Sequence, residues 1–136
     1  MLKQVSVFAE NRTGAMKKIT EVLDAAGINI LGSVNNDSAE YGIVRMIVSA
    51  PERAAELLTA AGYQCRMTRV LGVEVEDEVG NLNKLLGALA ESNINVNYIY
   101  LSFNRESAKP VMVFHTQDCE WVEKCLEQKG FKMTEV

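Results

Sequence analysis

Two short polar turns carry the side chains best suited to binding a small charged molecule. They are Asn11-Arg12-Thr13-Gly14 and Asp77-Glu78-Val79-Gly80. Each turn precedes a predicted helix, whose first N–H groups favour a carboxylate, and glycine lets the backbone approach a ligand closely. Asn29 and Asn95 follow at equivalent places, and a side-chain amide can both donate and accept hydrogen bonds. An amino acid offers partners for all of these groups.

A purely structural role is the alternative for the same residues. Asn11 and Asp77 could cap the helices, Gly14 and Gly80 could be steric necessities, and the two asparagines could solvate strand ends. The pattern occurs in both halves of the chain. This repetition raises the weight of a binding site without excluding the structural role.

Residues that usually carry catalysis or hold metals are sparse. His115 is the only histidine, and we expect it at a structural or rim position. Cys65, Cys119 and Cys125 are odd in number and lack CxxC spacing, so we expect reduced thiols and no metal site. The N-terminus alternates apolar and polar residues instead of carrying a signal-peptide core, and no apolar run could span a bilayer, so we expect a cytoplasmic protein. With no evident nucleophile or base, the sequence predicts neither an enzyme nor a bound cofactor.

Other conspicuous side chains have several possible roles. Arg45, in an apolar strand, could lie on the open face of a sheet, pair with a carboxylate or meet a second chain. Trp121 is expected in packing or an interface. Tyr98, Tyr100 and Phe103 could stack on nucleobases, but the basic and aromatic signature of RNA-recognition modules is absent.

The secondary-structure elements that position these residues lie in two copies of an internal sequence repeat. From Val5 to about residue 31, the chain matches the segment that starts at Leu71 at a constant offset of 66. The identical pairs are Val7 and Val73, Glu10 and Glu76, Gly14 and Gly80, Lys18 and Lys84, Leu23 and Leu89, Ile28 and Ile94, and Asn29 and Asn95. Later the offset is 68, where Gly62-Tyr63 matches Gly130-Phe131. We therefore predict two modules, residues 1–70 and 71–136.

Each copy predicts the order βαββαβ. In the first copy, alternation at residues 5–9 indicates a strand, and the apolar spacing at 15–26 indicates a helix. Strands follow at 28–34 and 41–48, then a helix from Pro51 and a strand at 63–70. The second copy predicts strands at 73–75, 94–103, 110–116 and 131–136, and its second helix starts after the predicted cap Asp118. The fold class is α+β, with two ferredoxin-like modules whose antiparallel sheets carry helices on one face.

Composition and charge exclude some classes of binding partner. The chain is 48% hydrophobic and 24% charged, and no apolar run is long enough to span a bilayer. Residues 1–70 hold eight Lys and Arg against seven Asp and Glu, whereas residues 71–136 hold six against eleven. An acidic half disfavours polyanions, so we expect neither a nucleic acid nor a membrane as a partner.

The two segments ENRTGAMKKITEVLDAAGINI and EDEVGNLNKLLGALAESNINV resemble the opening of ACT domains. The shared pattern is a strand, an acidic or amide residue shortly before a glycine, an amphipathic helix and a G-I-N-I-like strand. The arrangement is similar to free-standing tandem ACT proteins. Thr13 and Val79 depart from the proline that many ACT turns carry before the glycine, and Asn93 replaces the glycine found at Gly27.

The resemblance implies a regulatory protein that binds a free amino acid at the junction of two modules, where the turn of one module faces strand two of its neighbour. The first implied set is Asn11, Arg12, Thr13, Gly14, Ala15 and Met16 facing Asn95, Val96 and Asn97. The second set is Asp77, Glu78, Val79, Gly80, Asn81 and Leu82 facing Asn29, Ile30 and Leu31. The carboxylates of the second turn suit an ammonium group, so turn charge alone predicts tighter binding there.

Two functions remain open at this level. The first is an amino-acid sensor that acts allosterically on a partner and forms a homodimer. The second is a subunit that assembles with an amino-acid biosynthetic enzyme without any ligand. Stabilisation by one or two of the twenty amino acids would distinguish the sensor from the assembly subunit.

Overall fold

The computed structural model describes residues 1–10, 12–36 and 41–134 of the chain. They form two compact units. The N-terminal unit is Lys3–Thr68, and the C-terminal unit comprises Met1–Leu2 and the chain from Arg69 onward. The sequence places the division two residues later, after residue 70.

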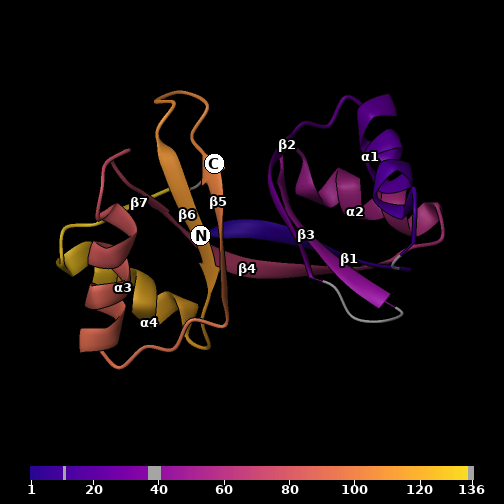
Figure 1. Ribbon diagram of the computed structural model, residues 1–136. Helices are drawn as coiled ribbons and strands as arrows, with labels where there is room; N and C mark the ends of the chain where they lie inside the picture. The colour runs from indigo at the N-terminus through magenta and orange to yellow at the C-terminus, as the bar shows by residue number, and fades with distance from the viewer. Residues whose placement is uncertain (11, 37–40, 135–136) are drawn as a thin grey trace. The chain divides into compact units, whose positions relative to one another are not determined.

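The N-terminal unit has the predicted βαββαβ order. Its elements are β1 (Leu2–Glu10), α1 (Ala15–Ala25), β2 (Ile30–Asn36), β3 (Tyr41–Val48), α2 (Pro51–Ala60) and β4 (Gln64–Glu74). The strand order is β2-β3-β1-β4, and β3 is antiparallel to both of its neighbours. Both helices cover one face of this sheet (Figure 1), so the ferredoxin-like prediction is confirmed.

Alternation along β1 builds the core of this unit. The buried core residues are Val5, Val7 and Ala9 from β1, Val44, Met46 and Val48 from β3, and Ile19, Leu23, Ile28, Ala54 and Leu58 from the α1 and α2 segments. Fully burying one leucine or isoleucine is worth roughly 1.5–3 kcal/mol. The core therefore holds the first turn of α1 against the end of β1, where the polar turn begins.

The C-terminal unit repeats this architecture and uses the last part of β4 as its first strand. Its further elements are α3 (Asn81–Glu91), β5 (Tyr98–Phe103), β6 (Pro110–His115), α4 (Cys119–Gln128) and β7 (Lys132–Met133). The strand order is β5-β6-β4-β7, with antiparallel pairing throughout. The core is Leu71, Val73, Val75, Leu85, Leu89, Phe114, Val122 and Leu126. One continuous strand thus ends the first repeat and starts the second.

Glycines, rather than polar caps, start the first helix of each unit. Gly14 and Gly80 occupy the N-cap positions with φ of 82° and 90°, and neither helix has a side-chain cap. The expectation that Asp77 could cap α3 is therefore wrong, and Asn11 lies outside the described residues. The Asp118 prediction is confirmed, because its carboxylate accepts a hydrogen bond from the Trp121 N–H of α4 at 3.3 Å.

The strand starts differ from the predicted ones. β2 begins at Ile30 rather than residue 28, because Ile28 still bonds its N–H to the Leu23 carbonyl of the helix end. β5 begins at Tyr98 rather than residue 94, since β6 ends at His115, which pairs with Tyr98. Asn93 takes the left-handed conformation of Gly27, with φ of 56° against 71°. No helix in the described parts of the chain is long and apolar enough to cross a membrane.

Two glycines of the C-terminal unit should respond oppositely to alanine. Gly80→Ala forces a side chain into left-handed backbone, which should lower the free energy of unfolding by about 1–2 kcal/mol. Gly87→Ala lies inside α3, where an added Cβ meets nothing within 4 Å, and should raise it by about 0.5–1 kcal/mol. Urea unfolding of both variants measures the difference, and equal effects would contradict this account of the turn.

Candidate functional site

Each unit has a hollow at the end of its first strand. The N-terminal hollow is lined by Phe8, Ala9, Glu10, Arg12, Thr13, Ala15, Lys18, Gly62, Tyr63 and Gln64. The C-terminal hollow is lined by Glu74, Val75, Glu76, Glu78, Asn81, Lys84, Lys109, Gly130, Phe131 and Lys132. Apart from Thr13 and Lys109, these lining residues pair one to one at the offsets of 66 and 68. The same place in the fold is therefore open in both repeats.

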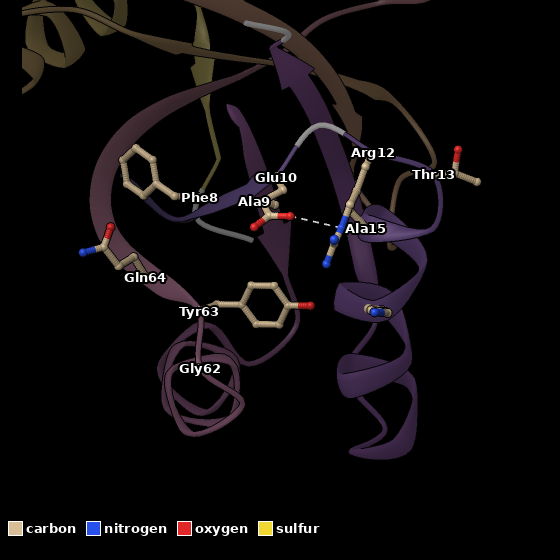
Figure 2. Close-up of a pocket in the computed structure, with 10 residues that line it drawn as sticks. Phe8, Ala9, Glu10, Arg12, Thr13, Ala15, Gly62, Tyr63 and Gln64 are labelled. Carbon is tan, nitrogen blue, oxygen red and sulfur yellow. Dashed lines mark ion pairs between the residues drawn. The ribbon is translucent and has the colours of Figure 1, made fainter. Parts of the chain in front are cut away.

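The N-terminal hollow combines two cations, one carboxylate and a phenol. Figure 2 shows the Tyr63 ring in the middle, with its hydroxyl pointing toward α1. The Arg12 guanidinium extends into the same space and pairs with Glu10, at 3.1 Å between Nε and Oε2 (Figure 2). Both partners are more than half exposed, so this ion pair is weak and its groups stay available to a ligand. The hollow has a volume of about 700 Å³.

The charges of the C-terminal hollow are mostly paired with each other. Lys132 Nζ lies 3.3 Å from Glu74 Oε1, and Lys109 Nζ lies 2.7 Å from Glu76 Oε1. Asn104 Nδ2 donates a further hydrogen bond to Glu74 at 2.9 Å. The volume is about 240 Å³, roughly a third of that in the N-terminal unit. These ion pairs engage four of the six charged side chains that line this hollow, and the buried Glu74 is the one held most firmly.

Glu74 is the most deeply placed of these charges, with a side chain only 2% exposed. Burial, the largest single influence, raises its pKa. The hydrogen bonds from Asn104 and Lys132, together with the charges of Lys132 and Lys109, outweigh burial, so the pKa of Glu74 lies below its ordinary 4.5. The Glu76 carboxylate in turn raises the pKa of Lys109 by accepting its hydrogen bond. The network thus stabilises Glu74 as a carboxylate.

The structure brings together only part of each predicted turn. In the N-terminal unit Arg12, Thr13 and Ala15 line the hollow, whereas Met16 packs against the core and Gly14 shapes the backbone. Asn11 lies outside the described residues.

In the C-terminal unit Glu78 and Asn81 line the hollow, and the Asn81 amide donates to the Glu76 carbonyl. Asp77, Val79 and Leu82 are exposed and do not belong to its lining. Gly80 has the shaping role of Gly14.

The predicted strand-two residues lie outside the hollow of their own unit. The exposed Asn29 donates its backbone N–H to Ser49 Oγ, Ile30 packs against the core and Leu31 is buried. In the C-terminal unit Val96 packs against the core. Their participation in a site stays a prediction of the sequence.

Asn95 and Asn97 are tied to the one histidine of the chain. Asn95 Nδ2 lies 3.4 Å from Asn97 Oδ1, and Asn97 Nδ2 lies 2.9 Å from His115 Nδ1. Tyr98 stacks on the His115 ring at 5.4 Å between centroids. His115 is half-buried at the end of β6, opposite the first residue of β5, so these contacts join the two asparagines to the end of β6.

Several lining residues are not predicted by the sequence. Glu74, Lys109 and Lys132 have no charged counterpart in the first repeat, so the repeat comparison could not single them out. By contrast, Glu10, Lys18 and Tyr63 were visible as members of repeated pairs, and that repetition was the available signal. Among the described residues, no group of three or more His, Cys, Asp or Glu side chains could hold a metal ion, and the three cysteines are free.

Comparison with known proteins identifies the family. The family model for an ACT domain pair matches residues 1–134. The chain belongs to the ACT domain family. Each ACT domain of the pair thus carries one hollow at the end of its first strand. No curated protein is similar enough in sequence to count as a match.

Two solved structures have a fold similar to that of this chain. Protein BT0572 from Bacteroides thetaiotaomicron is similar at a TM-score of 0.89 and 28% identity, over 98% of this chain and 91% of that one. The ligand-free regulatory subunit of aspartate kinase from Thermus thermophilus is similar at a TM-score of 0.66 and 15% identity, over 93% of this chain and 90% of that one. The second likeness shows the shared fold.

Glu74 should make the free energy of unfolding depend on pH. Because its folded-state pKa is lowered, its contribution is present above the ordinary pKa and is lost as pH falls through the folded-state value. Glu74→Gln should therefore lower the free energy of unfolding by on the order of 1 kcal/mol or more at neutral pH, as expected for hydrogen bonds to a charged group. In acid the difference from wild type should vanish.

Urea unfolding at both pH values measures this dependence. Glu76→Gln is the matched control, since its ion pair with Lys109 is exposed and should contribute little. A Glu74→Gln deficit that persists unchanged in acid would contradict the assignment of a charged Glu74.

Proposed function

We propose that this ACT domain pair is a regulatory protein that binds a free amino acid at its polar turns and has no catalytic activity of its own. The observation that carries the proposal is the repeated hollow, which places charged groups of both signs beside the predicted turns. An amino acid presents a carboxylate and an ammonium a few atoms apart, and both need a partner when they leave water.

Membership of the ACT domain family supports a regulatory role. The fold is shared with the regulatory subunit of an aspartate kinase, which supports an amino-acid biosynthetic enzyme as the partner. The ligand acts on such a partner only if it binds two states of the protein unequally, and a coupling of about 1–3 kcal/mol suffices for a 5- to 150-fold effect.

Thermal unfolding with each of the twenty amino acids tests the proposal. One or two of them should raise the melting temperature, because a ligand that binds only the folded state adds about 2.7 kcal/mol of stability at 100 times its dissociation constant. If none stabilises the protein while it still binds and regulates an enzyme, the ligand-independent assembly subunit is correct instead.

A second copy of the chain is the other proposed partner. β5 ends the strand order of its unit and exposes Leu101 at 59% and Phe103 at 46%. Exposed edge strands with apolar side chains are templates for pairing with another chain.

Leu101→Lys should therefore convert a dimer to a monomer in light scattering. Val79→Lys is the control, since Val79 is fully exposed in a turn and should leave the mass unchanged. A dimer that survives Leu101→Lys would show that this edge is not the interface.

A further inference from the structure

The two hollows differ in charge at equivalent positions. The N-terminal hollow has one carboxylate, Glu10, and two cations, Arg12 and Lys18. The C-terminal hollow has three carboxylates and three lysines. The decisive exchange is Arg12 for Glu78, which reverses the charge at one place in the fold. The first hollow therefore carries one net positive charge, and the second carries none.

We propose that the N-terminal hollow selects an amino acid with a second carboxylate, aspartate or glutamate, and that the C-terminal hollow excludes it. The proposal rests on the amino-acid ligand proposed above and specifies its class and its place. An acidic amino acid has two anionic groups and one cationic group. This set complements the two cations and one carboxylate of the N-terminal hollow.

Lys18 and Tyr63 supply the clearest contacts for such a ligand. The Lys18 side chain is exposed on the first turn of α1 and lines the hollow, while its backbone N–H donates to the Gly14 carbonyl at 3.1 Å. Its nearest carboxylate influence is electrostatic, because its charge helps to lower the pKa of Glu21. The Tyr63 hydroxyl points toward the same helix and can donate to a carboxylate (Figure 2). Phe131, at the equivalent place in the C-terminal unit, has no hydroxyl. Glu10 remains for the ligand ammonium, and Arg12 can turn from Glu10 to the second carboxylate.

The volumes of the two hollows also favour the N-terminal unit as the place where the ligand binds. Ligand pockets usually enclose about 300–1,000 Å³. The N-terminal hollow, at about 700 Å³, falls in this range, and the C-terminal hollow, at about 240 Å³, does not. Glu74, Lys109 and Lys132, which surround the smaller hollow, already pair among themselves and with Glu76.

The proposal places the tighter binding in the N-terminal hollow, whereas the charges of the turns alone predict tighter binding in the C-terminal unit. The turn Asp77-Glu78 suggested a partner for an ammonium group in the second repeat. In the folded unit Glu74 and Glu76 add to this negative charge and bind Lys132 and Lys109. Because the charges of that hollow cancel, it offers an incoming carboxylate no net attraction, whereas the N-terminal hollow carries one net positive charge.

Isothermal titration of the full chain with aspartate, asparagine, glutamate and glutamine tests the inference. One acidic amino acid should bind once per chain, and its neutral amide should bind at least about tenfold more weakly, the loss of one charge-assisted contact. Lys18→Met should weaken binding of the acidic amino acid by a similar factor. Lys84→Met removes the equivalent lysine of the other hollow and should change it less than twofold.

The outcomes separate this inference from the proposed function. Equal binding of the acid and its amide, or a loss confined to Lys84→Met, would overturn the inference while an amino acid still binds. Binding of no amino acid at all would overturn both. Because Lys18 and Lys84 are exposed, both methionine variants should keep the wild-type melting temperature, and that measurement confirms folding.

Discussion

The left-handed glycine between the first strand and the first helix of each repeat is the constraint on which the site depends. At Gly14 and Gly80 the chain turns from strand to helix without a capping side chain. Only glycine takes this conformation without a steric cost of about 1–2 kcal/mol. The polar residues of the turn are therefore not needed to cap the helix. Of these residues, Arg12, Thr13 and Glu78 line the open hollow beside the helix of their unit.

Because the fold is duplicated, the same backbone arrangement occurs twice with different charged residues around the hollow. The cores of both units are built from equivalent apolar positions, such as Leu23 and Leu89 under the first helices. The residues that line the hollows do not belong to the equivalent core positions, and there the two repeats differ, with Arg12 against Glu78 and Phe8 against Glu74. A regulatory protein with two unlike sites can respond to one ligand at one of them and keep the other for stability.

In the C-terminal unit, charged residues that line the hollow bind each other and so stabilise the fold. Glu74, Lys132 and Asn104 form this network. A buried carboxylate is costly unless its charge is paired and its oxygens are hydrogen bonded. Lys132 and Asn104 meet this need from the last strand and from the loop after β5. In the first repeat the same place holds Phe8, which needs no partner, and the neighbouring cations remain open to solvent.

The sequence by itself determined the duplicated βαββαβ fold, because apolar periodicity, glycines and a constant repeat offset are local or nearly local signals. It also singled out the two turns. Only the tertiary structure decided which turn residues face a hollow, since Arg12 and Asp77 are equally polar in the sequence but only Arg12 lines one. It alone brought Lys109 and Lys132 to Glu76 and Glu74, 33 and 58 residues away. Pairing across such separations depends on the register of strands, which the spacing of residues along the chain does not reveal.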